Sequence, residues 1–121
     1  MRVLVCGGRD YRDARRIHSE LDSIRNTIGL LVLIHGAAPG ADRLAGEWAK
    51  KRGIPVEDFP ALWYPDGKDG GRDDKAGPKR NARMLDEGRP DLVVAFPGWA
   101  GTNDMVERAR AAGVRVIEIA G

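Results

Sequence analysis

Glycines beside a hydroxyl or a charged side chain recur where apolar runs of this chain end. The clearest case is Phe96-Pro-Gly-Trp-Ala-Gly-Thr102, which leads from an apolar run into a helical pattern. Gly98 and Gly101 would let the backbone approach a ligand closely, because glycine has no Cβ. Thr102 would add a hydroxyl at a helix start, where the first N–H groups lack intrahelical partners and favour an anion. The run therefore predicts an anion site, typically for a phosphate.

Two earlier junctions have the same character. Gly7-Gly8-Arg9-Asp10 follows the first apolar run, and His35-Gly-Ala-Ala-Pro-Gly-Ala-Asp42 follows the second. Neither the Walker pattern nor the dinucleotide fingerprint fits, because no Gly-Lys-Thr/Ser follows and no Gly-x-Gly-x-x-Gly opens the first helix. Three such junctions at one end of a sheet predict a phosphate site of another type, with Gly8, Gly36 and Gly40 in its floor.

Several polar residues at these junctions have two possible roles, one structural and one in ligand binding. Arg9 could reach the anion or pair with Asp10 or Asp13. Asp42 could cap the second helix or hold its turn, or it could bind a ribose hydroxyl. His35 could titrate near neutrality, or it could be half-buried and donate to the backbone.

Five apolar runs supply the strands that would position these junctions. Most are continuous rather than alternating, as expected for parallel strands covered on both faces. Helical patterns separate them, which predicts a single-domain, three-layer α/β sandwich over residues 1–121 with a mainly parallel five-stranded sheet. The expected strands are Val3–Cys6, Leu30–Ile34, Val56–Phe59, Leu92–Phe96 and Val114–Ile119, and the helical patterns cover Ala14–Ile28, Leu44–Ala49, Gly77–Glu87 and Met105–Ala112.

Capping residues mark the helix ends. Asp10, with Asp13 three residues later, would cap the first helix. A glycine in the left-handed conformation would end each helix, at Gly29, Gly53, Gly88 and Gly113. The segment 60–76 interrupts the alternation of apolar runs and helical patterns, and it predicts a flexible, solvated loop, or a lid over a ligand. Trp63 in that segment could be core, a dimer contact or a base-stacking surface.

Composition narrows the class of protein. The net charge of +2 over 121 residues does not indicate nucleic-acid binding by itself, since the basic residues are spread along the chain. The single cysteine, Cys6, excludes an internal disulfide and suits a reducing compartment. No leader follows Met1 and no apolar run could span a bilayer, so we expect a cytoplasmic protein without membrane contact. No Cys/His cluster has metal-ligand spacing, and we expect no metal and no cofactor.

Four motifs together resemble a known family. Gly-Gly-Arg-Asp-Tyr at 7–11, His-Gly-Ala-Ala-Pro-Gly-Ala-Asp at 35–42, Ala-Gly-Pro-Lys-Arg-Asn at 76–81 and Phe-Pro-Gly-x-x-Gly-Thr at 96–102 resemble the YspA/YpsA-related branch of the SLOG superfamily. That superfamily includes LOG-type nucleoside-monophosphate phosphoribohydrolases and the Rossmann-like domain of DprA. The resemblance implies a Rossmann-like fold that binds nucleotides or nucleotide-derived ligands, and a sensor role would fit.

The resemblance also carries over to single positions. Gly98, Gly101 and Thr102 match the LOG-type phosphate loop, in which Trp99 replaces the second glycine. Arg80 matches the arginine of the LOG Arg-Lys pair, and Asn81 stands in place of the lysine. Asp104 matches the glutamate after Gly-Thr. The shorter carboxylate would draw back from the ligand, while the indole would narrow the site or offer a stacking face. The expected ligand contacts are Gly8, Arg9, Gly36, Gly40, Asp42, Arg80, Asn81, Gly98, Trp99, Gly101 and Thr102.

Three functions follow from these motifs. The first is binding of a nucleotide or nucleotide-derived ligand at the carboxyl ends of the strands. The second is cleavage of the N-glycosidic bond of a nucleoside 5′-monophosphate, with Arg80 and Asp104 as catalytic residues. The third is DprA-like binding of single-stranded nucleic acid, although the chain has no evident stripe of aromatic and basic residues to support it. A homodimer or higher homo-oligomer is expected, through a helix face and Trp48 or Trp63.

Overall fold

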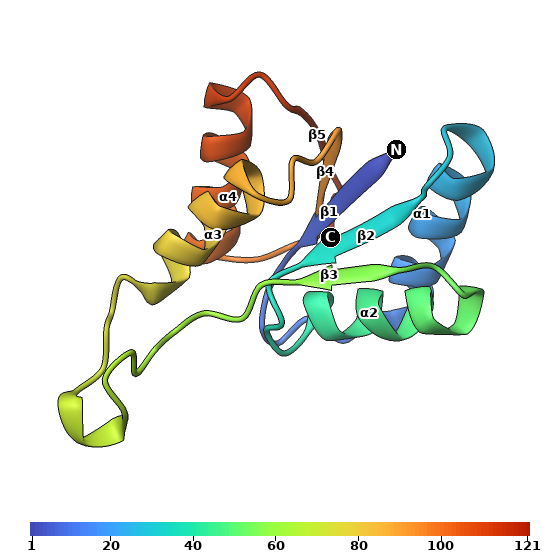
Figure 1. Ribbon diagram of the computed structural model, residues 1–121. Coiled ribbons are helices and arrows are strands. Elements are labelled where there is room, and N and C mark those ends of the chain that lie inside the picture. Colours follow the sequence, from blue (N-terminus) through green and yellow to red (C-terminus); the bar gives the residue numbers. More distant parts are fainter.

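A five-stranded, entirely parallel sheet forms the centre of the computed structural model, which describes residues 1–121 (Figure 1). The strand order β3-β2-β1-β4-β5 is that of a Rossmann-like fold and confirms the predicted architecture. The strands are β1 (Arg2–Cys6), β2 (Val32–His35), β3 (Val56–Asp58), β4 (Leu92–Ala95) and β5 (Arg115–Glu118). The helices are α1 (Ala14–Thr27), α2 (Ala41–Arg52), α3 (Ala76–Asp86) and α4 (Ala100–Ala111), with a short 3-10 helix η1 (Lys68–Gly70).

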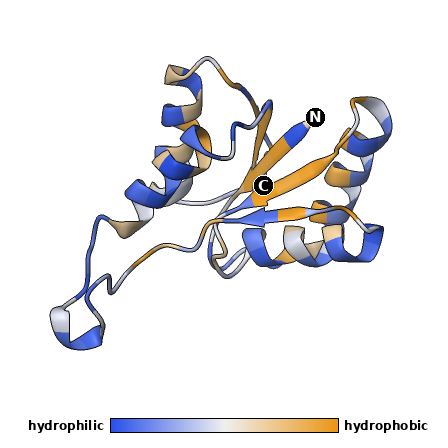
Figure 2. Ribbon diagram, viewed as in Figure 1, coloured by the Kyte–Doolittle hydropathy of each residue, from blue (hydrophilic) through white to orange (hydrophobic).

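Helices α1 and α2 cover one face of the sheet, and α3 and α4 cover the other (Figure 1). Two hydrophobic cores result: the first lies between the sheet and helices α1 and α2, and the second lies between the sheet and helices α3 and α4. Because successive strand residues point to opposite faces, Val3 and Val5 pack in the first core while Leu4 and Cys6 pack in the second. This double burial explains why the central strands are continuously apolar, as their hydrophobic colouring shows (Figure 2). Cys6, at the end of β1, is a buried residue of the core.

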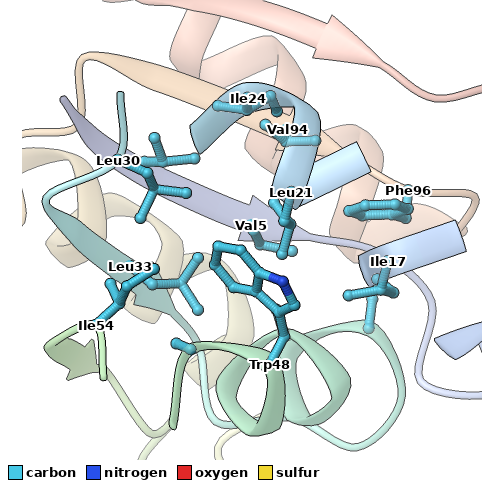
Figure 3. Close-up of a cluster of buried hydrophobic side chains, with 14 of the residues drawn as sticks. Val5, Ile17, Leu21, Ile24, Leu30, Leu33, Trp48, Ile54, Val94 and Phe96 are labelled. Carbon is cyan, nitrogen blue, oxygen red and sulfur yellow. The ribbon is translucent and has the colours of Figure 1, made fainter. Parts of the chain in front are cut away.

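Trp48 lies at the centre of the first core and is fully buried. Its indole reaches from α2 toward Val5, Leu21 and Leu33 (Figure 3). The indole N–H donates to Asp22 Oδ1 of α1 at 3.0 Å, so its one polar atom is paired inside the fold. The prediction that Trp48 contributes to a dimer contact is therefore wrong: a side chain with no exposed surface has nothing to offer a partner.

Two predicted helix ends differ from the structure. The N-cap of α1 is Asp13 rather than Asp10, because Asp13 Oδ1 accepts from the backbone N–H of Arg16 at 3.0 Å. Beyond α3 the left-handed residue is Arg89, with φ of 46°, and not Gly88. A Cβ on Gly88 would collide with the carbonyl oxygen of Met84, so glycine is required there for close packing. Gly29, Gly53 and Gly113 are left-handed as predicted.

The segment 60–75 between β3 and α3 extends away from the sheet (Figure 1). Trp63 anchors it, because the guanidinium groups of Arg9 and Arg72 lie over the indole ring at 5.4 and 4.7 Å from its centroid. The carbonyl of Trp63 also accepts from the N–H of Asp73 at 2.7 Å. Trp63 is therefore half-buried by its own chain and lies outside both cores.

Candidate functional site

The three glycine-containing junctions meet at the carboxyl ends of β1, β2 and β4. Gly8 joins them, because its N–H donates to the carbonyl of Pro97 at 2.8 Å and its carbonyl accepts from the N–H of Ala41 at 3.1 Å. The strand order reverses between β1 and β4, and ligands of open α/β sheets bind beside such a reversal. The convergence predicted from the sequence is thus confirmed.

A cleft of ≈ 550 Å³ opens at this point. Its wall comes from the loops that follow β1 and β2, from α3 and from the start of α4. Eight of the predicted contact residues line it: Gly8, Arg9, Asp42, Arg80, Asn81, Trp99, Gly101 and Thr102. The residues without a predicted role in ligand binding are Cys6, Gly7, Asp10, Arg12, Ala38, Pro39 and Met84. Arg12 could have been anticipated, because it follows Gly8 in the same strand–helix loop.

Three predicted contact residues, Gly36, Gly40 and Gly98, lie behind the wall instead of in it. A Cβ on Gly36 would collide with the Arg80 guanidinium, and a Cβ on Gly98 would collide with the Thr102 hydroxyl. Gly40 has φ of 80° and packs against the carbonyl of Gly8. These glycines therefore allow other groups to reach the cleft and do not face it themselves.

Asp42 holds the turn after β2. Its Oδ2 accepts from the backbone N–H groups of Gly36 at 3.0 Å and Ala38 at 3.2 Å, which favours the turn-holding interpretation of this residue. The carboxyl group is buried. Burial raises the pKa of Asp42 to about 6, although the hydrogen bond from Ala38 and the charge of Arg80 oppose that shift.

His35 completes the same turn. Its Nδ1 accepts from the N–H of Ala37 at 2.9 Å, so the histidine is an acceptor and the predicted donation to the backbone is wrong. Ala37 has φ of 57°, a left-handed conformation that this hydrogen bond helps to hold. Burial lowers the pKa of His35, and the charge of Arg80 acts in the same direction against that of Asp58. Together with Asp42, His35 therefore fixes three consecutive backbone N–H groups, those of residues 36–38.

Arg80 projects from α3 into the cleft and is half-buried. Its Nη1 donates to the carbonyl of Gly36, and its Nε donates to Asn81 Oδ1 at 3.0 Å. Both acceptors are neutral, and Arg80 forms no salt bridge. Burial lowers the pKa of Arg80, and the charge of Arg9 adds to this while Asp42 opposes it. The guanidinium is therefore a cation without a carboxylate partner.

Asn81, which lines the cleft, connects α3 to Asp104 of α4, which does not. Asn81 Nδ2 donates to Asp104 Oδ2 at 2.9 Å and to the carbonyl of Gly101 at 3.2 Å. Arg108 Nε donates to the same Asp104 oxygen at 2.8 Å. Asp104 is the fifth residue of α4 and lies beyond the first helical turn. It does not line the cleft.

The start of α4 forms one rim of the cleft. Trp99 precedes the helix, and its carbonyl accepts the first helical bond, from Asn103 N–H at 2.9 Å. The N–H groups of the next three residues, 100–102, donate to no backbone or side-chain acceptor of the chain. Such groups, together with the positive end of the helix dipole, favour an anion. Thr102 is buried beneath them.

Comparisons with known proteins agree with this arrangement. The YspA, cpYpsA-related SLOG family matches residues 1–64, more than half of the chain. The Gene 61 protein of Mycobacterium phage D29 is 36% identical over 124 residues, and that match spans 96% of this chain and 94% of the phage protein. The chain belongs to the YspA, cpYpsA-related SLOG family. All four SLOG-like motifs contribute residues to the cleft or directly behind it.

Solved structures show the same SLOG-type fold. DNA processing protein A (DprA) from Streptococcus pneumoniae superimposes with a TM-score of 0.77 at 22% identity, over 99% of this chain and 50% of DprA. The Moco carrier protein from Chlamydomonas reinhardtii gives 0.64 at 21% identity, over 98% of this chain and 75% of that protein. This chain therefore spans half the length of the DprA structure. None of its helices is long and apolar enough to cross a membrane.

Proposed function

We propose that this SLOG-family protein binds a nucleotide or nucleotide-derived ligand, whose phosphate occupies the cleft at the carboxyl ends of the strands. The observation that carries the proposal is the excess of cationic groups there. Arg9, Arg12 and Arg80 line the cleft, against two aspartates, Asp10 and Asp42. The carboxylate of Asp42 already accepts hydrogen bonds from two backbone N–H groups.

Arg80 explains why the ligand should be an anion. Its guanidinium is half-buried, has only neutral acceptors and lies close enough to Arg9 for the two charges to repel. A partly desolvated charge without a carboxylate in contact raises the free energy of the folded protein, and the charge of Asp42 offsets this cost only in part. A phosphate would offset both costs, and the planar guanidinium suits it because two N–H groups can donate side by side.

The size and composition of the cleft support a mononucleotide-sized ligand. A volume of ≈ 550 Å³ lies in the range of ordinary small-molecule sites. Trp99 is its single aromatic side chain, whereas single-stranded nucleic acids are usually bound along rows of such side chains. The name of one fold neighbour refers to DNA processing and that of another to carrying Moco. We favour the smaller ligand for this chain.

A thermal-shift panel tests the proposal. The ligands are nucleoside monophosphates, ADP-ribose, NAD and cyclic nucleotides, and the variant is Arg80→Gln. Arg83→Gln is the matched control, because Arg83 lies on the same helix and also donates to a backbone carbonyl, that of Pro60, but does not line the cleft. A ligand at about a hundred times its Kd adds about 2.7 kcal/mol, which raises Tm by several degrees.

We expect at least one nucleotide to shift the wild type and Arg83→Gln but not Arg80→Gln. A folded wild type that responds to none of these ligands would refute the proposal. Equal shifts in both variants would place the ligand somewhere other than at Arg80.

A second candidate function, hydrolysis of the N-glycosidic bond, has one observation in its favour. Asp10 lines the cleft and forms no salt bridge, whereas Asp104 is bonded to Asn81 and Arg108 behind it. Water would add to the anomeric carbon as the C–N bond breaks and the base leaves with a proton, and a carboxylate would stabilise the cationic sugar. Release of free base from AMP that is lost in Asp10→Asn and retained in Asp104→Asn would support this function. No release above the Asp10→Asn background would exclude it.

A further inference from the structure

The three tryptophans of the chain differ in what covers their rings. The Trp48 ring is buried, with the Arg52 guanidinium 5.8 Å from its centroid. Trp63 has the guanidinium groups of Arg9 and Arg72 over it. Trp99 is 76% exposed, and neither a guanidinium nor another aromatic ring lies over it. The structure therefore leaves one indole without a stacking partner.

This indole shares the cleft with the cationic groups. Trp99 is the single aromatic side chain of the wall that also contains Arg9, Arg12 and Arg80. The other large exposed hydrophobic side chains lie elsewhere, and none of them lines the cleft; they are Ile28, Leu31, Val56, Leu62 and Tyr64. Trp99 is thus part of a hollow lined by three arginines and is not joined to another large exposed apolar side chain of the kind that forms a protein-docking patch.

We infer that Trp99 is a specificity-determining residue, which stacks on the aromatic base of a nucleotide whose phosphate is held by the cleft arginines. The inference rests on the proposed function and adds the chemical class of the second ligand group, a flat π system. Arginines bind phosphates whatever organic group is attached, so they cannot by themselves select a nucleotide over a sugar phosphate. An indole face supplies that selection, because every nucleobase has a π face and a sugar has none.

Nucleoside monophosphates and ribose 5-phosphate, titrated by calorimetry, separate the two contributions. Both kinds of ligand carry the same phosphate, and only the nucleotides carry a base. We expect the wild type to bind at least one nucleoside monophosphate roughly 5- to 150-fold more tightly than ribose 5-phosphate, the range of one base–aromatic stack. Trp99→Ala should remove that preference and leave the affinity for ribose 5-phosphate unchanged. Trp99→Phe should retain most of the preference.

Arg80→Gln is the contrasting variant, because loss of a phosphate contact should weaken nucleotides and ribose 5-phosphate alike. Each variant is checked by circular dichroism, and we expect Trp99→Ala to fold since the indole is largely exposed and belongs to neither core. If Trp99→Ala weakens both ligands equally, or neither, the inference is overturned while the proposed function stands. If the wild type binds neither kind of ligand, the proposed function fails and the inference falls with it. Dissociation of an oligomer by Trp99→Ala, with unchanged ligand preference, would assign the indole to a subunit contact.

Discussion

Arg80 and Gly36 lie 44 residues apart in the chain, and the Arg80 guanidinium donates to the Gly36 carbonyl oxygen. The N–H of Gly36 in turn donates to Asp42. Asp42, a buried carboxylate at the start of α2, thus holds the N–H of the same residue whose carbonyl binds an arginine of α3. Arg80 and Asp42 both line the cleft, whereas Gly36, which contacts both of them, does not. The position of Arg80 in the cleft therefore depends on a glycine outside its wall.

Gly36→Ala should therefore weaken phosphate binding. The new methyl group would collide with the end of the Arg80 side chain, which is flexible enough to move away. We expect at least a tenfold loss of nucleotide affinity with a change in the free energy of unfolding below about 1 kcal/mol. Calorimetric titration and urea unfolding measure the two quantities. An unchanged affinity would show that the position of Arg80 does not control binding.

Gly101→Ala should weaken ligand binding without destabilising the fold. A Cβ on Gly101 meets no protein atom within 4 Å, yet the residue lines the cleft in the first turn of α4. Alanine in a helix is more favourable than glycine by roughly 0.5–1 kcal/mol, so thermal unfolding should show a small gain in stability. The same methyl group would occupy ligand space, and nucleotide affinity should fall. A variant that is more stable and binds equally well would move the ligand away from α4.

Asp42 makes stability depend on pH. Its pKa is about 6 in the folded protein against 3.8 in its ordinary state, so the folded protein binds this proton more tightly than the unfolded chain does. The free energy of unfolding should therefore fall as the pH rises from about 4 to about 6, by about 3 kcal/mol from this group. Urea unfolding of the wild type and Asp42→Asn across this range should show the fall in the wild type only. Parallel curves for the two proteins would contradict the prediction.

His35 contributes with the opposite sign and needs its own control. Its pKa is lowered in the folded protein, so the unfolded chain takes up the proton first as the pH falls below about 6.5. This group therefore lowers the free energy of unfolding toward acid pH. His35→Asn retains an acceptor for the Ala37 N–H and removes the titration. The Asp42 contribution should be seen most clearly when Asp42→Asn is compared within the His35→Asn background.

Asp104→Asn should affect stability and not binding. The substitution removes the charge that Arg108 pairs with and disturbs the bond from Asn81, both of which join α3 to α4. We expect a loss of about 1 kcal/mol in the free energy of unfolding, as for one hydrogen-bonded contact. Nucleotide affinity should change less than twofold, because Asp104 does not line the cleft. A large loss of affinity with unchanged stability would instead favour a direct role for this carboxylate.

Local patterns were sufficient to predict the strands, the helices and the end of the sheet where the loops meet. Boundaries shifted where tertiary packing decides: Leu30 belongs to the core but precedes β2, and Leu31 is 72% exposed. The burial of Trp48 could not be read from its helix, because a tryptophan on an apolar stripe fits a core and an interface equally well. Only the position of Asp22 on α1 shows that the indole N–H of Trp48 is paired inside the fold.

Within the site, the sequence indicated which glycines matter but not what each one accommodates. Gly36 makes room for Arg80, a residue on another helix, and no spacing in the sequence reveals that contact. The contact between Asn81 and Asp104 likewise joins two helices, α3 and α4, and could not be predicted from sequence spacing. Both were placed at the ligand by their positions in motifs, whereas Asp104 is held behind the cleft by contacts between α3 and α4.

The most direct test of the central claim is an NMR titration of the ¹⁵N-labelled protein with the nucleoside monophosphate that gives the largest thermal shift, or with AMP if none does. We expect saturable shifts of the backbone N–H signals of Gly8, Gly101 and Thr102 and of the Arg80 Nε–H signal. The Arg80→Gln protein should show none of these changes at the same concentrations. Shifts confined to other parts of the chain, or a spectrum that does not change, would contradict an anion-binding cleft at the carboxyl ends of these strands.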